Sequence, residues 1–280
     1  WRDAPRLRAV VDLTHGVPAG DVATGAFLLA RAWTTFPAGS VHVAIVDPGV
    51  GTQRALLLVE ARGHVFLGPD NGLLAPLIAA EPMVVVRKVG VSAPVRGPST
   101  TFDGRDRFAP LAARLVEGDP PAAFGEVLAG PDDYHALAPR VPERHADGSI
   151  SAEVLHVDGF GNLITNLPFI WLAEAGADWR ERWSARIGSR TIPLLRTYGD
   201  APAESAVALV NSYDHLEIAV AQGDAARVLG LGRGAKVRFV PRVEAKPAAA
   251  AKASAKKPTA KTHVAKNGER AKRSAKGRKS

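Results

Sequence analysis

The stretch of residues 41–54, V-H-V-A-I-V-D-P-G-V-G-T-Q-R, combines an apolar run with groups that can do chemistry. Its β-branched first half predicts a short buried strand, which the following proline and glycines end. In an open α/β sheet, ligands bind beyond the carboxyl ends of the strands. Asp47 is the first polar side chain after this strand, and Arg54 follows seven residues later. We therefore take Asp47 as a candidate catalytic acid with Arg54 as its nearby cation.

Two interpretations of this loop stay open. Asp, Pro and Gly each favour turns, so residues 47–49 can form a turn without any chemical role. Alternatively, the glycines let a ligand approach the backbone closely, between the acid and the arginine. The loop is not a P-loop, because G-V-G-T lacks the lysine and the spacing that hold a phosphate chain.

A second polar segment, F-D-G-R-D at residues 102–106, stands before a predicted helix at residues 108–116. Asp103 and Asp106 can cap the free backbone N–H groups of that helix, since acidic groups are favourable at helix N-termini. They can equally belong to a site. The residue types alone leave both possibilities open.

A third polar segment, D-G-F-G-N-L-I-T-N, occupies residues 158–166. Phe160 can stack on a planar base, Asn162 can hydrogen-bond a base edge in both directions, and Asp158 can hold an ammonium group. The alternative is a plain turn with glycine at positive φ. A similar polar loop, N-S-Y, contains Ser212.

The first half of the chain alternates strand and helix patterns. A strand at residues 9–15 and a helix that begins after Asp21 lead to the strand before Asp47, which predicts a parallel β-α-β unit. The further elements are strands at residues 55–60, 65–67 and 83–89 and helices at 73–80, delayed or kinked by Pro76, and 108–116. Residues 1–142 are thus predicted to form an α/β domain, with a mostly parallel sheet and flanking helices.

The pattern changes after residue 118. Turn-forming residues are followed by short strands at residues 150–157, 206–209, 216–220 and 235–240, and residues 184–195 have the pattern of a strand, a turn and a second strand. Short strands at close spacing predict a small β-sandwich or barrel. We place this all-β, barrel-like domain at residues 148–241, with the boundary near residues 140–148.

The net charge of +8 comes from one end of the chain. Residues 246–280 carry a net charge of +11, and the remainder carries −3. Residues 245–280 contain little that is apolar beyond alanine, which predicts a disordered tail. The tail can serve solubility alone, or residues 246–280 can act as an electrostatic arm for a nucleic acid or another polyanion.

The chain contains no cysteine, which excludes disulfides and thiolate metal sites. No run approaches the roughly 18 to 20 apolar residues of a membrane span, and the first residues have no signal-peptide core. We therefore expect no membrane contact and a cytoplasmic protein.

Six motifs in order resemble the family of S-adenosyl-L-methionine hydroxide adenosyltransferases, relatives of the fluorinase and chlorinase. The resemblance runs from about Val10 to Val240. It rests on D-L-T-H at 12–15, D-P-G-V-G-T-Q-R at 47–54, P-D-N-G at 69–72, F-D-G-R-D at 102–106, D-G-F-G-N-L-I-T-N at 158–166 and N-S-Y-D-H-L-E-I-A at 211–219.

The resemblance implies an α/β domain followed by a β-barrel, in a homotrimer that holds its substrate between neighbouring subunits. It also implies an activity, in which water or hydroxide attacks C5′ of S-adenosylmethionine and releases adenosine and methionine. Neither a metal nor a cofactor is expected. Two other functions stay open: a non-catalytic adenosine or S-adenosylmethionine binding protein, and a nucleic-acid-associated protein tethered by its tail.

The same resemblance assigns roles to single residues. An Asp-Arg-His set positions the water in hydrolytic members, and its Asp and Arg fall on Asp47 and Arg54. The His position holds Asp103 here, so a carboxylate stands where an imidazole is expected. The substrate contacts are Asp158 at the amino-acid end, Phe160 and Asn162 at the adenine, and Ser212 at the methionyl end.

A second departure concerns the start of the chain. Family members begin with a strand and a D-F-G-x-x-D loop that holds the ribose hydroxyls, and residue 1 of this sequence lies beyond that point. We therefore expect the 280 residues alone to fold poorly or to be weakly active. Restoring upstream codons should improve solubility and turnover.

Overall fold

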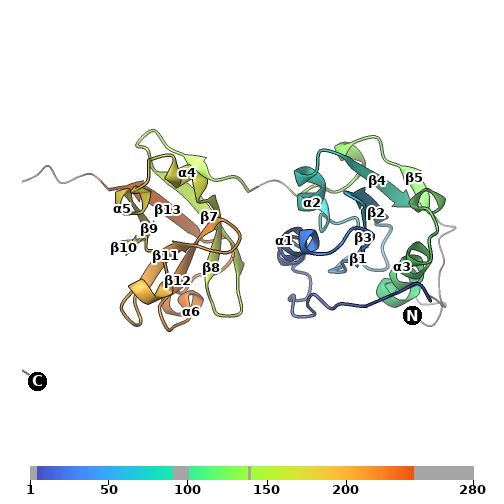
Figure 1. Cartoon of the computed structure of the whole chain (residues 1–280), viewed down its shortest axis with the longest axis horizontal. Helices are drawn as coiled ribbons and strands as arrows, with labels where there is room; N and C mark the ends of the chain where they lie inside the picture. Colours follow the sequence, from blue (N-terminus) through green and yellow to red (C-terminus); the bar gives the residue numbers. More distant parts are fainter. Residues whose placement is uncertain (1–4, 91–100, 138–139, 243–280) are drawn as a thin grey trace, which may run out of the picture. The chain divides into compact units, whose positions relative to one another are not determined.

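The computed structural model describes residues 5–90, 101–137 and 140–242, and these contain two sheets that follow one another along the chain (Figure 1). The tail predicted at residues 245–280 lies outside the described residues. The predicted fold class is confirmed, since a sheet with flanking helices precedes a barrel-like all-β sheet. Within the described residues, no helix combines the length and apolarity that a membrane span requires.

The first sheet has five strands in the order β1-β3-β2-β4-β5. Their bounds are Val41–Val43 for β1, Leu56–Ala61 for β2, His64–Pro69 for β3, Val84–Val89 for β4 and Gly125–Val127 for β5. The sheet is mixed rather than mostly parallel as predicted, because β1 and β3 run parallel while the other three pairs run antiparallel. The tight turn at Arg62 and Gly63, both at positive φ, makes β2 and β3 a hairpin, and a hairpin is necessarily antiparallel.

Helices cover both faces of this sheet (Figure 1). On one face α1, Val22–Ala32, and α2, Ala75–Ala80, pack on alternate residues of β2. On the other face α3, Ala109–Val116, packs on the remaining residues of that strand. Successive side chains of β2 point to opposite faces of the sheet, so this one strand contributes to the hydrophobic core on each face.

The predicted helix starts are confirmed where a local signal sets them. The Asp21 carboxylate caps α1 by accepting from the Thr24 backbone N–H at 3.1 Å. Pro76 lies in the first turn of α2, where its missing N–H costs nothing, so the helix begins late, as expected.

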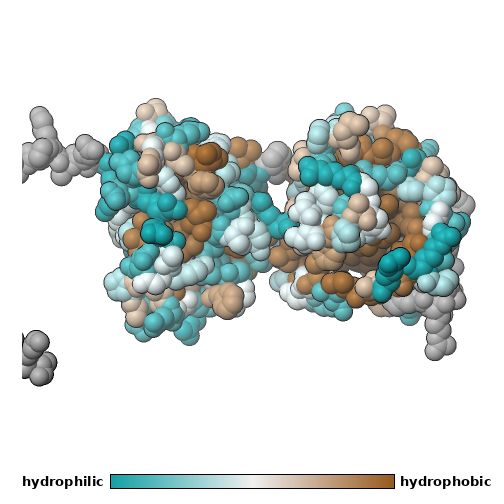
Figure 2. Space-filling view, viewed as in Figure 1, coloured by the Kyte–Doolittle hydropathy of each residue, from teal (hydrophilic) through white to brown (hydrophobic). Residues whose placement is uncertain are grey.

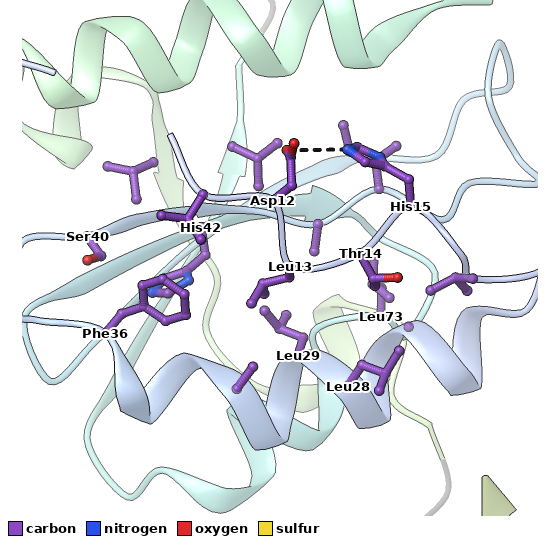
Figure 3. Close-up of a pocket in the computed structure, with 18 of the residues that line it drawn as sticks. Asp12, Leu13, Thr14, His15, Leu28, Leu29, Phe36, Ser40, His42 and Leu73 are labelled. Atoms are coloured by element: carbon purple, nitrogen blue, oxygen red, sulfur yellow. Dashed lines mark ion pairs between the residues drawn. The ribbon is translucent and has the colours of Figure 1, made fainter. Parts of the chain in front are cut away.

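The predicted strand at residues 9–15 does not form. No strand of the described residues pairs with this segment, and Val10, Val11 and Leu13 are about half exposed. A cavity of about 1570 Å³ is lined by residues 6–15 on one side and residues 36–48 on another (Figure 3). Apolar residues border a hollow on this domain (Figure 2). A strand needs a hydrogen-bonding neighbour, so the parallel β-α-β unit is absent here.

The second sheet has eight strands in the order β10-β9-β13-β7-β8-β12-β11, with β6 paired to β7. The bounds are Glu143–Arg144 for β6, Ile150–Val157 for β7, Leu163–Pro168 for β8, Trp183–Ile187 for β9, Arg190–Pro193 for β10, Ala206–Val210 for β11, His215–Val220 for β12 and Lys236–Pro241 for β13. A parallel bridge between Leu194 and Ala208 joins the two ends of this order, so the sheet nearly closes. Three short helices accompany it: α4, Ile170–Ala173; α5, Trp179–Arg182; and α6, Ala225–Leu229.

A histidine pair lies inside the first domain. His42 Nε2 lies 3.1 Å from His64 Nδ1, and both residues are buried. The His42 ring stacks on Phe66, with ring centroids 4.7 Å apart. Burial, with a smaller effect of His64, lowers the pKa of His42 to about 4.

The pKa of His42 makes stability depend on pH. The unfolded chain titrates near pH 6.5, so it binds protons before the folded chain does. The stabilising contribution is complete above that pH and is lost as the pH falls from about 6.5 to about 4. We expect urea unfolding to show about 2 kcal/mol less stability at pH 5 than at pH 7 from this residue.

Two variants isolate this contribution. His42→Gln should flatten the pH dependence over that range, whereas His135→Gln, at an exposed histidine, should leave it unchanged. Equal pH dependence in wild type and His42→Gln would contradict the expectation.

Candidate functional site

Asp47, Arg54 and Asp103 form one buried cluster in the first domain. Arg54 Nε donates to Asp47 Oδ1 at 2.9 Å, and Arg54 Nη2 donates to Asp47 Oδ2. The same Nη2 donates to Asp103 Oδ2 at 2.5 Å. The structure therefore brings together the three residues named as catalytic candidates, two from the loop after β1 and one from the segment before α3.

The loop after β1 positions two of these side chains. Asp47 Oδ1 accepts from the Gly49 N–H at 3.2 Å, and the Thr52 hydroxyl donates to the Gly49 carbonyl at 2.7 Å. Gly51 adopts φ of 81°, which a residue without Cβ adopts freely. The two interpretations of this loop are thus compatible, because one carboxylate both closes the turn and holds Arg54.

Asp103 does not cap a helix, so the capping interpretation is wrong for this residue. It precedes a π-helical turn, Gly104–Phe108, and makes no capping hydrogen bond. A Cβ added at Gly104 would lie 3.3 Å from Ile45 Cδ1, so glycine allows this turn to approach the segment that carries Asp47. Asp106 binds a different arginine from Asp103, since it accepts two hydrogen bonds from Arg105, at 2.7 and 2.8 Å.

The two carboxylates differ in their free acceptor capacity. Both oxygens of Asp47 accept hydrogen bonds within the cluster. Asp103 Oδ1 accepts none from the described residues, and Arg107 Nη1 stays 3.9 Å from Asp103 Oδ2. Asp103 is therefore the carboxylate with an oxygen left for a further donor such as water.

The charges of the cluster are coupled. Burial by itself lowers the pKa of Arg54, but hydrogen bonds and charge attraction from Asp47 and Asp103 outweigh this effect and raise it. Arg54 thus stays a cation shared by two acids. Within the described residues, no group of three His or carboxylate side chains is arranged to hold a metal ion.

A pocket of about 460 Å³ lies within the second domain. Its lining includes Asp158, Phe160, Asn162 and Ser212, the four residues predicted to contact substrate. Asp158 accepts from the backbone N–H groups of Phe160 and Asn162, both at 2.9 Å, and from Asn162 Nδ2 at 3.0 Å. These bonds form the predicted turn, and the turn leaves the residue Phe160 81 % exposed at the pocket.

Outside the N-S-Y loop, sequence reasoning gave no role to five further polar residues of this pocket, namely His156, Arg196, Thr197, Tyr198 and Glu217. Glu217 carries a signal that could have found it, because it interrupts the apolar strand L-E-I-A, where a charged residue is expensive to bury. Tyr198 and Arg196 belong to the connection between β10 and β11, and nothing in their local pattern places them at the pocket.

Removal of Arg54 should destabilise the first domain, because two buried carboxylates lose their shared cation. We expect Arg54→Met to lower the free energy of unfolding by about 3–5 kcal/mol at neutral pH. Adding Asp103→Asn should recover part of this loss, since it removes one of the two charges. Denaturant unfolding of the three proteins measures both effects.

The matched control is Arg114→Met, which breaks a more exposed pair with Asp119. It should cost less than about 1 kcal/mol. A loss in Arg54→Met no larger than in this control would show that the cluster contributes little to stability.

Comparisons with known proteins place the chain in a family. The sequence model of the SAM hydroxide adenosyltransferase N-terminal domain matches residues 2–125, and that of the C-terminal domain matches residues 152–238. A protein of Salinispora arenicola named (R)-S-adenosyl-L-methionine hydrolase is 38 % identical over 245 residues, covering 85 % of this chain and 88 % of that protein. A protein of the same name from Thermus thermophilus is 38 % identical over 241 residues, covering 83 % and 88 %.

Two solved structures share the fold. An uncharacterized conserved protein from Thermotoga maritima has a TM-score of 0.77 at 31 % identity and covers 85 % of this chain and 91 % of its own. A conserved hypothetical protein from Thermus thermophilus has a TM-score of 0.65 at 34 % identity, covering 83 % and 87 %. The chain belongs to the SAM hydroxide adenosyltransferase family.

Proposed function

We propose that this protein hydrolyses S-adenosyl-L-methionine to adenosine and L-methionine. The observation that carries the proposal is the buried cluster in which Arg54 binds both Asp47 and Asp103. Relatives at 38 % identity bear the name (R)-S-adenosyl-L-methionine hydrolase, which supports the same substrate.

The hydrolysis requires the site mainly to position the two reactants. A water attacks C5′, the C5′–S bond breaks, and the sulfonium leaves as a neutral thioether. The site must orient one water and strip competing solvent from it. Asp103 Oδ1 has the free acceptor capacity to orient that water and take its proton, while Asp47 fixes Arg54 through a two-pronged contact. The proposal requires no metal or cofactor.

The pocket of the second domain supplies the substrate contacts in this proposal. Phe160 offers an exposed ring for the adenine, and the Asn162 side-chain oxygen remains available for its edge. Asp158 Oδ2 accepts one hydrogen bond from the described residues, which leaves capacity for the ammonium group. Ser212 lines the same pocket for the methionyl end.

A non-catalytic binding protein is the alternative, and Asp103 in place of the expected histidine is the observation that favours it. One measurement, the release of adenosine, distinguishes the hydrolase from the binding protein. A binding protein would take up S-adenosylmethionine without releasing adenosine.

Substitutions in the cluster test the catalytic roles. Asp47→Ala and Asp103→Asn should each lower kcat by about 10²-fold or more while largely sparing substrate affinity, since the lost contacts act on the water. Asp103→His should retain turnover. Chromatography of the products measures the rates, and calorimetry measures binding.

Asp119→Asn, at a partly exposed acid outside the cluster, serves as the control and should behave like wild type. Unchanged turnover in Asp47→Ala and Asp103→Asn would remove both residues from the mechanism. Binding without any product in wild type would favour the binding protein.

We also propose a cytoplasmic homotrimer with the substrate held between neighbouring subunits. Large apolar side chains are exposed in the segments that carry the site residues, namely Ile45, Phe102 and Phe160. These exposed side chains support the proposal to the extent that a neighbouring subunit would bury them together, since contiguous apolar patches mark interaction sites.

The tail is proposed to bind polyanions. Its charge of +11 over residues 246–280 would attract nucleic acid with an affinity that falls steeply as salt rises. Removing residues 245–280 should abolish binding to duplex DNA at low salt, measured by fluorescence anisotropy, and should leave hydrolysis unchanged. An unchanged DNA affinity would end this proposal, and a loss of hydrolysis would assign the tail to the enzyme instead.

A further inference from the structure

The second-domain pocket contains a buried acid that the proposed chemistry does not use. Glu217 is only 2 % exposed, and no other charged residue among the described residues of this domain is as buried. It lies on β12 between Leu216 and Ile218, which are fully buried. A carboxyl group in such a position is expensive unless its hydrogen bonds are satisfied.

Two register shifts occur on the strands that contribute to this pocket. The pairing of β12 with β8 shifts between His215 and Glu217, and the pairing of β7 with β8 shifts between Val154 and His156. Glu217 and His156 thereby pair with the same residue of β8, Ile164. All three line the pocket. Bulges that re-aim side chains are common beside functional sites.

Glu217 binds Tyr198 across the pocket. The Tyr198 hydroxyl donates to Glu217 Oε1 at 2.5 Å. Burial and the neighbouring Glu217 raise the pKa of this phenol, so it remains a donor at neutral pH, and burial raises the pKa of Glu217. The phenol is thus held at its hydroxyl end.

Apart from its hydroxyl group, the Tyr198 side chain is accessible from the pocket. The residue is 46 % exposed and lines the same pocket as Phe160, and neither ring stacks on another aromatic ring of the described residues. The short turn that carries it is closed by Thr197 N–H donating to Asp200 Oδ2 at 3.0 Å. Tyr198 therefore presents an anchored ring to a ligand, and an anchored ring costs less entropy to order upon binding.

We infer that Glu217 is a positioning residue for the substrate: through the hydroxyl of Tyr198 it fixes the phenol ring as a wall of the pocket for a planar purine base. This inference rests on the proposed function, because the base is that of S-adenosylmethionine. In this inference Glu217 acts on the base through its hydrogen bond with Tyr198.

A double-mutant cycle on adenosine affinity tests this coupling in the full chain. Tyr198→Phe keeps the ring and removes the anchor, and Glu217→Leu removes the acceptor. Each should weaken binding about 3- to 10-fold by calorimetry, the cost of ordering one freed side chain. The double variant should bind no more weakly than the single variants, because both lose the same contact. Glu217→Gln keeps an acceptor oxygen and should restore most of the affinity.

Glu153→Leu is the matched control, since Glu153 lies on β7 but pairs with Lys236 and Arg140 and does not line the pocket. It should leave the affinity for adenosine unchanged. With S-adenosylmethionine, the anchor variants should raise KM and leave kcat nearly constant, which a general loss of folded protein would not do.

Several results would overturn the inference: wild-type affinity in Tyr198→Phe, losses that multiply in the double variant, a Glu217→Gln protein as weak as Glu217→Leu, or no adenosine binding in wild type. The proposed hydrolysis fails differently. A wild type that binds adenosine and releases none from S-adenosylmethionine would contradict hydrolysis, and the binding cycle would still decide the role of Glu217.

Discussion

The sharing of one guanidinium between two buried carboxylates is the interaction on which the first domain's site depends. Arg54 uses a two-pronged contact for Asp47 and the same Nη2 for Asp103. Any one of these charges would be costly to bury alone, and their mutual attraction offsets that cost only in good geometry. The cluster therefore ties the loop after β1, the entry to β2 and the turn before α3 into one arrangement.

Local signals predicted the elements better than their pairing. Alternation and turn residues located β2, β3 and β4, and the Asp21 cap located α1, because these signals act within a few residues. Which strands become neighbours depends on contacts distant in sequence, so the sheet was wrongly expected to be mostly parallel. Residues 9–15 have a strand's composition but no strand partner, and composition alone does not form a strand.

The site residues were less predictable the farther their partners lie along the chain. Asp47 and Arg54 are seven residues apart, so one sequence motif, residues 47–54, was enough to predict that both belong to the site. Asp103 could be joined to them only through the family resemblance, because the π-helical turn and Gly104 that bring it close are not visible as a pattern. Glu217 was missed although its charge interrupts an apolar strand, because the register shift beside it is not visible in the sequence. Tyr198 was missed because nothing in its local pattern places the connection between β10 and β11 at the pocket.

The aspartate at position 103 changes the electrostatics of the cluster in one direction. Two carboxylates and one arginine carry one more negative charge than one carboxylate and one arginine beside a neutral imidazole, and Arg107 approaches only to 3.9 Å. In the proposed hydrolysis, this excess would favour a cationic sulfonium and a neutral water and would disfavour a halide ion as the nucleophile, because charges act strongly in a buried site. Under that proposal, an aspartate at position 103 would strengthen the electrostatic preference for water and would offer a carboxylate oxygen as acceptor where the resemblance leads us to expect an imidazole.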